Sequence, residues 1–225
     1  GETVDTDKTT MSSLVLVLGH GGGIAAILSA TFVLTASACS CGMLCPPIVS
    51  REEWGARLPK GHENLTTPVP LVIIHHTYKP SACFSWEACK KAMVEIQNFH
   101  MDNRGWDDIG YNFLVGDKYV FMGRGWQKVG AQAKGFNNIS IGISLIGDYT
   151  EELPSPCMLR LVKALIQCGV GNNYIAADYK LIGHRQVRDT ECPGKAFYHM
   201  IQSWDHWAPM ENKSAPHNVT ENLDN

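Results

Sequence analysis

Leu71-Val-Ile-Ile-His75 is the stretch that decides the fold. Its first four residues are apolar and rich in β-branched side chains, which is typical of a buried strand. The run ends at His75 and His76, so the predicted strand carries histidines at its end. Histidine is a common metal ligand and proton carrier, which makes this strand end a candidate functional site.

Strand and helix signals alternate beyond this strand. The segment Trp86–His100 has apolar residues at helical spacing with charged residues between them, and it predicts an amphipathic helix. The other expected elements are a hairpin of Tyr111–Val115 and Tyr119–Met122, a strand Ile141–Ile146, a helix from Pro156 to Gly169, a strand Lys180–His184 and a short helix Ala196–Trp204. This interleaved order, without a repeat, predicts an α/β domain.

Length and charge limit the class of protein. A chain of 225 residues suffices for one domain of ordinary size, with ends that need not belong to it. The 19 basic and 22 acidic side chains give a formal net charge of -3 and contain no basic run, so we expect no nucleic acid partner. Nothing in the pattern predicts an oligomeric state.

Cysteine usage predicts an oxidising compartment. Eight cysteines are many for a reduced cytosolic protein of this length. Sequons for N-glycosylation at Asn64, Asn138, Asn212 and Asn218 are compatible with secretion. We therefore expect an extracellular protein.

The N-terminal part predicts a targeting segment. Residues 11–38 lack charged side chains, include the apolar run Ile24–Leu34 and end in Ala36-Ser-Ala38, which is similar to a cleavage signal. Because the uncharged length exceeds the roughly 20 residues that cross a bilayer, a cleaved signal peptide and a membrane anchor both stay open. Gly21-Gly-Gly23 and the single preceding basic residue, Lys8, argue against both. We assign residues 1–45 to this segment and its flanks, 46–207 to the folded domain and 208–225 to a polar, disordered tail. Any membrane contact is expected only through the hydrophobic N-terminal segment.

Two histidines and a cysteine form a candidate metal site. Catalytic zinc takes three protein ligands and keeps one position open, and the candidates are His75 or His76, His184 and Cys192. Cys192 follows His184 by eight positions, too far for one helix face, so a loop must fold back. Spacing alone leaves alternatives open, because Cys192 can be half of a disulfide and His75 a packed histidine.

Longer motifs run from Ile48 to about Trp207. They are Ile48-Val-Ser-Arg-Glu-Glu-Trp-Gly-Ala56, Val72-Ile-Ile-His-His-Thr77, Gly105-Trp-Asp-Asp-Ile-Gly-Tyr111, Gly123-Arg-Gly-Trp126, Ser140-Ile-Gly-Ile143 and Gly183-His-Arg-Gln-Val-Arg-Asp-Thr-Glu-Cys-Pro-Gly194. Together they resemble the peptidoglycan recognition proteins, which share a fold with zinc amidases of the bacteriophage lysozyme kind. The resemblance implies a central mixed β-sheet flanked by helices in a single domain, a cleft for a muropeptide, and bacterial peptidoglycan as the partner.

The resemblance also implies the metal ligands. The first histidine of the pair, His75, would bind zinc together with His184 and Cys192. Family members without the cysteine bind peptidoglycan and do not cut it, so the presence of Cys192 implies an enzyme. A non-catalytic peptidoglycan receptor is the alternative.

The implied chemistry is hydrolysis of an amide. Bound zinc lowers the pKa of a water molecule from about 15.7 toward 7 and polarises a carbonyl. The expected cut lies between the lactyl group of N-acetylmuramic acid and L-alanine, with the Tyr111 hydroxyl bonded to the water or the oxyanion. Thr190 matches another residue of the family's catalytic centre. The resemblance favours a role in innate immunity, and damping of immune signalling is the first hypothesis.

The substrate-binding residues are taken from the resemblance as well. Arg124, Gly125 and Trp126 resemble the residues of members that prefer meso-diaminopimelate peptides, whose extra carboxylate a guanidinium can pair with. Gln132 stands where many catalytic relatives have histidine; it can hydrogen-bond a ligand but cannot titrate near pH 7. Strand alternation turns His76 away from His75, so we expect His76 to pack or to support the substrate site.

Four cysteines match structural bridges of the family. Cys83 and Cys89 resemble its small disulfide loop, and Cys45 with Cys168 resembles a second bridge that ties down the N-terminal segment. Cys39, Cys41 and Cys157 have no assigned pairing.

Overall fold

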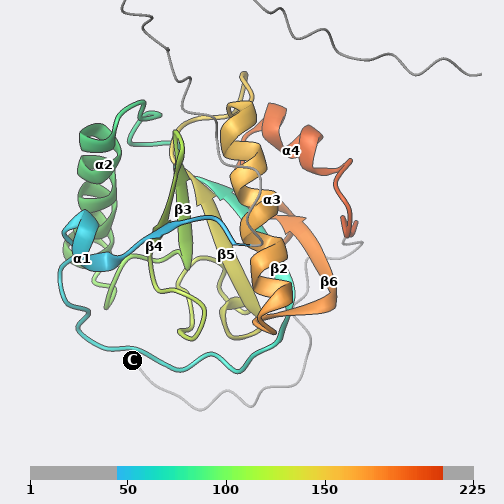
Figure 1. Ribbon diagram of the computed structural model, residues 1–225, viewed down its shortest axis with the longest axis horizontal. Coiled ribbons are helices and arrows are strands. Elements are labelled where there is room, and N and C mark those ends of the chain that lie inside the picture. Colours follow the sequence, from blue (N-terminus) through green and yellow to red (C-terminus); the bar gives the residue numbers. More distant parts are fainter. Residues whose placement is uncertain (1–44, 210–225) are drawn as a thin grey trace, which may run out of the picture. The chain divides into compact units, whose positions relative to one another are not determined.

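The computed structural model describes residues 45–209, in which a six-stranded sheet lies between helices (Figure 1). The strands are β1 (Ile48–Val49), β2 (Val69–His76), β3 (Phe113–Gly116), β4 (Tyr119–Met122), β5 (Ser140–Leu145) and β6 (Ile175–Gly183). The helices are α1 (Arg51–Trp54), α2 (Trp86–Asn98), α3 (Pro156–Gly171) and α4 (Lys195–Ile201), with a π-helical turn at Phe99–Asn103 and 3₁₀ turns at Asn137–Ile139 and His184–Gln186. The predicted α/β class is confirmed.

Strand β2 lies inside the sheet, whose strand order is β1-β4-β3-β5-β2-β6. It pairs in parallel with β5 on one side and β6 on the other, while β3 and β4 form an antiparallel hairpin. Val72, Ile73 and Ile74 are fully buried, so β2 is covered on both faces, as its apolar run predicts. Parallel pairing brings the carboxyl ends of β2, β5 and β6 to the same edge of the sheet.

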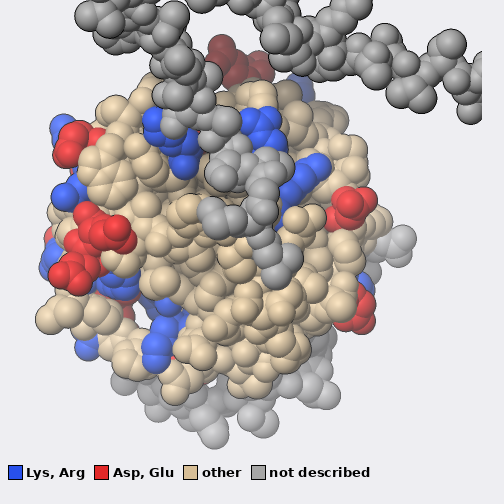
Figure 2. Space-filling view, viewed as in Figure 1, with Lys and Arg blue, Asp and Glu red and all other residues tan. Residues whose placement is uncertain are grey.

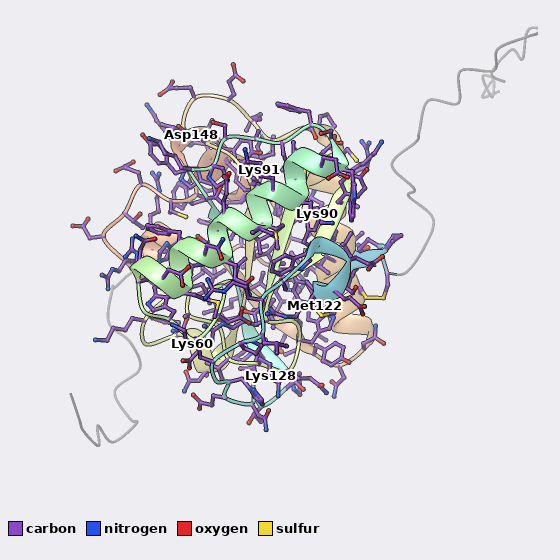
Figure 3. All side chains as sticks on the ribbon, turned by 90° about the vertical axis from the view of Figure 1, so that its left-hand side faces the viewer. Lys60, Lys90, Lys91, Met122, Lys128 and Asp148 are labelled. Atoms are coloured by element: carbon purple, nitrogen blue, oxygen red, sulfur yellow. A yellow bond between two sulfur atoms is a disulfide. The ribbon has the colours of Figure 1, made fainter. Side chains whose placement is uncertain are left out.

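Each face of this mixed sheet packs against its own helices. Helices α3 and α4 form the larger core on one face, and α1 and α2 cover the other face over β3 and β4. In α2, Met93 and Ile96 are buried, whereas Lys90 and Lys91 lie on the outer side of the helix (Figure 3). The helix is therefore amphipathic, as its spacing predicts.

The prediction that α3 ends at Gly169 is wrong, because the helix continues to Gly171. Gly169 lies inside the helix because its neighbours approach too closely for a side chain. A Cβ there would lie 2.6 Å from Ile175 Cδ1 and 2.8 Å from the Trp126 ring. This glycine therefore permits close packing and does not end the helix.

The predicted bounds differ at other elements too. Strand β6 begins at Ile175, five residues before the expected Lys180, because its first half is an exposed edge without an apolar run. Helix α4 ends at Ile201, short of Trp204. The short elements β1 and α1 are absent from the prediction, since four residues are too few to show a helical period; the capping box of Ser50 and Glu53 is the signal that could have found α1.

Two disulfides join pairs of cysteines within residues 45–209. Cys45 bonds to Cys168 of α3, and Cys83 bonds to Cys89 in the first turn of α2, as the resemblance implies. Within residues 45–209, Cys192 is the one free cysteine. The alternative that Cys192 forms a disulfide is therefore excluded.

Several expectations fall outside the described residues: the targeting segment, Cys39, Cys41, the sequons at Asn212 and Asn218, and the polar tail. Cys157, which lies in α3, is disulfide-bonded. Between residues 45 and 209 no helix is both long enough and apolar enough to cross a membrane. On the face shown in Figure 2, basic and acidic side chains lie around a broad uncharged area, consistent with the balanced composition.

Candidate metal centre and active site

The two histidines of the candidate metal site lie at the ends of neighbouring strands. His75 lies near the end of β2, and His184 directly follows β6. In the parallel pairing of these strands Ile74 is opposite Gly183, so the next residue on each strand reaches the same edge of the sheet. The two imidazole rings have their centroids 4.4 Å apart.

The loop after His184 folds back and brings Cys192 to the histidines. The Arg185 amide donates to the Cys192 carbonyl at 2.9 Å, and the Cys192 amide donates to the Thr190 hydroxyl at 3.2 Å. The Cys192 sulfur accepts a hydrogen bond from the His76 amide at 3.4 Å. These contacts accomplish the loop reversal that the eight-residue spacing requires.

The three side chains have the geometry of a zinc site. Ligand atoms of His75, His184 and Cys192 lie within 4.8 Å of one another. Cys192 Sγ is 3.7 Å from His75 Nδ1, close to the separation of about 3.6 Å across a tetrahedral zinc with bonds of about 2.3 and 2.05 Å. Two imidazoles and one thiolate leave a fourth position open, which is the pattern of catalytic zinc. The donor set therefore fits the metal.

Burial sets the protonation of these ligands. It holds the pKa of His75 well below its ordinary value and lowers the pKa of His184 to about 4. Both imidazoles are thus neutral near pH 7 and each has a lone pair to give. Burial also raises the pKa of the Cys192 thiol to about 12, so a thiolate at this position requires an adjacent cation.

Tyr111 lies beside the candidate ligands. Its ring centroid is 5.3 Å from that of His75 and 5.6 Å from that of His100. Burial, and then the Cys192 thiol, raise the pKa of the Tyr111 phenol above its ordinary value. The hydroxyl therefore keeps its proton near neutral pH and can donate a hydrogen bond to developing negative charge.

A cleft of about 970 Å³ has Tyr111 and His184 in its wall. Phe99 and Trp106 add aromatic surface to that wall. Its charged residues are mostly basic and comprise Lys79, Arg104, Lys134 and Arg188 against the single acidic residue Glu95. This balance favours an anionic ligand.

Comparison with known proteins decides the family. Residues 65–195 match the family described as N-acetylmuramoyl-L-alanine amidase. Peptidoglycan-recognition protein LB of Drosophila melanogaster is 47% identical over 180 residues, which cover 80% of this chain and 78% of that protein. The chain belongs to the peptidoglycan recognition protein family.

Two further relatives connect the family to an activity and a ligand. The mouse protein named N-acetylmuramoyl-L-alanine amidase is 42% identical over 172 residues, 75% of this chain and 32% of the relative, so the chain spans about a third of that protein. A solved structure of peptidoglycan recognition protein LE with tracheal cytotoxin, described as monomeric diaminopimelic acid-type peptidoglycan, aligns with a TM-score of 0.72 at 40% identity. That alignment covers 73% of this chain and 97% of the solved one.

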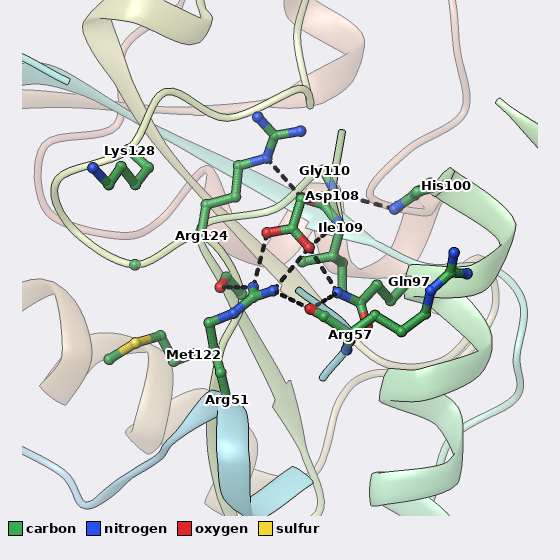
Figure 4. A network of polar contacts seen from close by, with 12 residues as sticks. Arg51, Arg57, Gln97, His100, Asp108, Ile109, Gly110, Met122, Arg124 and Lys128 are labelled. Carbon is green, nitrogen blue, oxygen red and sulfur yellow. Dashed lines mark hydrogen bonds and ion pairs between the residues drawn. The ribbon is translucent and has the colours of Figure 1, made fainter. Parts of the chain in front are cut away.

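In this peptidoglycan recognition protein, Arg124 is not among the residues that line the described cleft. Its Nε donates to the Ile109 carbonyl at 2.8 Å (Figure 4), and its Nη1 donates to the Val129 carbonyl at 2.9 Å. The guanidinium is half-buried and held by backbone, which leaves part of its donor set for a ligand.

Gly125 and Trp126 also lie away from the described cleft wall. The buried Gly125 has a φ of 74°, and its carbonyl accepts a hydrogen bond from Asn112 Nδ2 at 2.9 Å. Trp126 packs on Phe113 with ring centroids 4.3 Å apart and stacks on Tyr174 at 5.1 Å. The structure thus gives these two residues contacts inside the fold.

A partly buried ion pair fixes the segment that leads to Tyr111. The Asp108 carboxylate accepts a hydrogen bond from Arg51 Nη2 at 3.0 Å, and its second oxygen forms an ion pair with Arg51 Nη1 at 2.9 Å (Figure 4). It also accepts from Gln97 Nε2 at 2.7 Å and from the Ile109 amide at 2.8 Å. Helices α1 and α2 therefore both hold the loop that places Tyr111.

His76 and Thr190 support the site without lining the described cleft. The His76 ring lies on the opposite side of β2 from His75, where its Nδ1 accepts from the Tyr149 amide at 3.1 Å. Burial lowers the pKa of His76 to about 4. Thr190 holds the Cys192 loop through its hydroxyl. Both residues therefore contact Cys192: the His76 amide donates to its sulfur, and the Thr190 hydroxyl accepts from its amide.

Sequence reasoning missed most residues of the cleft wall, among them His100, Arg104 and Trp106. His100 is buried, accepts from the Gly110 amide at 3.0 Å and lies 4.7 Å from the Trp106 ring. These residues belong to the π-helical turn and the loop after it, where the predicted helix loses its regular period. The motif Gly105–Tyr111 was a signal for Trp106, but nothing in the local pattern marked His100.

Proposed function

We propose that this chain is a zinc-dependent N-acetylmuramoyl-L-alanine amidase that hydrolyses the lactyl-L-alanine amide of peptidoglycan. The observation that carries the proposal is the convergence of His75, His184 and Cys192 beside Tyr111. Of these residues, His184 and Tyr111 lie in the wall of a cleft whose charged residues are mostly basic. Membership of the amidase family supports the reaction. The complete ligand set supports an enzyme over a receptor that only binds.

When bound, zinc supplies a Lewis acid and lowers the pKa of a water molecule at its open position. His75, His184 and Cys192 would hold the metal, with the imidazoles neutral and the thiol as thiolate. The Tyr111 hydroxyl donates a hydrogen bond to the oxygen on which negative charge develops. The basic side chains of the cleft bind carboxylates of the stem peptide and orient the amide.

The test of this function is zinc-dependent release of stem peptides from diaminopimelate-type peptidoglycan, followed by mass spectrometry. We expect a chelator to stop release and added Zn²⁺ to restore it, because removal of the metal leaves the ligands without a Lewis acid. Release that continues at full rate after chelation contradicts the proposal. Binding of peptidoglycan without release at any zinc concentration identifies a receptor.

We further propose that the stem peptide contains diaminopimelate and that Arg124 pairs with its extra carboxylate. The two backbone carbonyls that hold the Arg124 guanidinium reduce its freedom before binding, which lowers the entropic cost of a paired contact. The solved structure of protein LE, a relative with the same fold, contains a diaminopimelic acid-type peptidoglycan, and this ligand supports a diaminopimelate stem peptide as the substrate.

Replacing Arg124 by Thr is expected to lower kcat/KM for diaminopimelate muropeptides about 10-fold or more and to leave lysine muropeptides nearly unchanged. The reason is that a hydrogen bond to a charged group contributes about 1.5–3 kcal/mol and only the first peptide type has the extra carboxylate. The matched control is Arg104→Thr in the cleft wall, which should weaken both peptides alike. If Arg124→Thr keeps the wild-type preference for diaminopimelate over lysine muropeptides, Arg124 does not pair with the extra carboxylate.

We propose that residues 46–207 act as one domain outside the cell. The disulfides Cys45–Cys168 and Cys83–Cys89 support an oxidising compartment, and the exposed Asn64 is available to a glycan. Hydrolysis of muropeptides would remove a bacterial signal, so the proposed role in innate immunity is to damp the response.

A further inference from the structure

Gln132 packs closely against β5 below the candidate metal site. In the register of the sheet, Ser140 and Gly142 of β5 lie opposite Leu71 and Ile73 of β2, so they share the face that carries His75. A Cβ on Gly142 would lie 2.5 Å from Gln132 Cγ. The glycine thus leaves the space that the Gln132 side chain fills, and the side chain is buried.

A chain of hydrogen bonds determines which way the Gln132 amide faces. The Ser140 hydroxyl donates to the Phe136 carbonyl at 2.7 Å, and Gln132 Nε2 lies 2.9 Å from Ser140 Oγ. A serine hydroxyl has one proton, and here the Phe136 carbonyl receives it. Ser140 therefore accepts from Gln132, which places the amide nitrogen toward Ser140 and the amide oxygen toward His75.

This orientation determines the tautomer of His75, which is the choice of the ring nitrogen that carries the proton. Gln132 Oε1 lies 2.5 Å from His75 Nε2 and can only accept a hydrogen bond, so Nε2 carries the proton. A neutral imidazole has a single N–H, which leaves the lone pair on Nδ1. Nδ1 is the nitrogen that lies 3.7 Å from Cys192 Sγ.

We propose that Gln132 is a positioning residue that fixes His75 in its Nε2-protonated form, with Nδ1 directed at the zinc. The inference rests on the proposed zinc site. Metal-binding histidines commonly donate their second N–H to a carbonyl or carboxylate, which orients the ring and increases its basicity. The Gln132 carbonyl performs this task here, and Gln132 also lies in the wall of the cleft.

The first experiment measures the tautomer directly in the wild-type chain. Long-range ¹H–¹⁵N correlation spectra of ¹⁵N-histidine-labelled, zinc-loaded protein report which ring nitrogen carries the proton, and a His75→Ala sample assigns the signals. We expect a protonated Nε2 and a metal-bound Nδ1 at His75. A protonated Nδ1 overturns the inference, whatever the amidase activity.

The second experiment compares variants by zinc affinity and by the visible absorption of the Co²⁺-substituted protein. Gln132→Met removes the acceptor at similar size, and we expect zinc affinity to fall about 10–100-fold with a changed Co²⁺ spectrum. Gln132→His should stay within about threefold of wild type, because a neutral imidazole offers one acceptor to His75 and one donor to Ser140.

Asn137→Ala is the matched structural control. Asn137 Oδ1 accepts from the amides of Gln132 and Ala133, so this variant loosens the same loop without touching His75. We expect its zinc affinity and Co²⁺ spectrum to match those of wild type. Equal losses in Gln132→Met and Asn137→Ala, or wild-type zinc affinity in Gln132→Met, overturn the positioning role. Circular dichroism verifies that each variant is folded. If Gln132→Met does not fold, the tautomer of His75 in the wild-type chain decides whether Gln132 is a positioning residue.

The two experiments separate this inference from the proposed function. A chain that binds zinc with the expected His75 tautomer but releases no stem peptides supports the positioning role and contradicts the amidase. A chain that releases stem peptides with zinc but has the other tautomer contradicts only the role of Gln132.

Discussion

Replacing Cys192 by Ser is expected to reduce peptide release by roughly 10³-fold or more, which corresponds to a barrier increase of about 4 kcal/mol. Cys192 supplies the one sulfur of the candidate ligand set. A serine hydroxyl stays protonated near neutral pH and is a poor ligand for zinc, which prefers thiolate and imidazole. The two remaining histidines would hold the metal weakly, so both zinc content and turnover should fall.

Binding of peptidoglycan by Cys192→Ser should stay within about threefold of wild type, since the cleft walls are made by other residues. The measurements are zinc content, stem-peptide release and pull-down with insoluble peptidoglycan. The matched control is Cys83→Ser combined with Cys89→Ser, which removes two cysteines of a disulfide and should keep zinc in the folded fraction. Parallel loss of binding and turnover in Cys192→Ser would mean that the metal holds the fold together.

The strand that carries His75 was predictable because the signal is local. An uninterrupted apolar run indicates burial on both faces, and strand alternation separates His75 from His76 without knowledge of the rest of the chain. The hairpin of β3 and β4 and the amphipathic helix α2 follow from equally local periods. These elements fix the sheet and the edge at which the site lies.

The ligand set needed contacts that no local pattern contains. His184 reaches His75 only because β6 pairs in parallel with β2, and Cys192 reaches both only because its loop reverses. Pairing between strands distant in sequence depends on the whole sheet. Resemblance to a family could name these residues, whereas spacing left a disulfide and a packed histidine open.

The position of Gln132 shows the same limit. Its sequence neighbours gave no reason to prefer a contact with His75 over a contact with a muropeptide. The distinction depends on Ser140 and Gly142, which β5 brings under the Gln132 side chain. Trp126 is a similar case, since its packing on Phe113 and Tyr174 follows from the approach of α3 to the sheet.

Replacing Tyr111 by Phe is expected to lower kcat about 10²–10³-fold, the usual cost of removing one hydrogen-bond donor to a developing oxyanion. The substitution removes only the hydroxyl, so the ring contacts with His75 and His100 remain. Zinc content and KM should therefore stay near their wild-type values. Single-turnover release of stem peptides, with zinc measured on the same sample, checks all three quantities.

Tyr78→Phe is the matched control for this prediction, because Tyr78 lines the same cleft but is 57% exposed. A hydroxyl in contact with water is replaced by water at little cost, so we expect the control to keep kcat within about twofold. A loss of zinc in Tyr111→Phe would make Tyr111 a support of the metal site. A rise in KM at unchanged kcat would make it a substrate-binding residue, since an interaction made only in the transition state lowers kcat. The combination of unchanged zinc, unchanged KM and reduced kcat is the result that the position of Tyr111 beside His75 predicts.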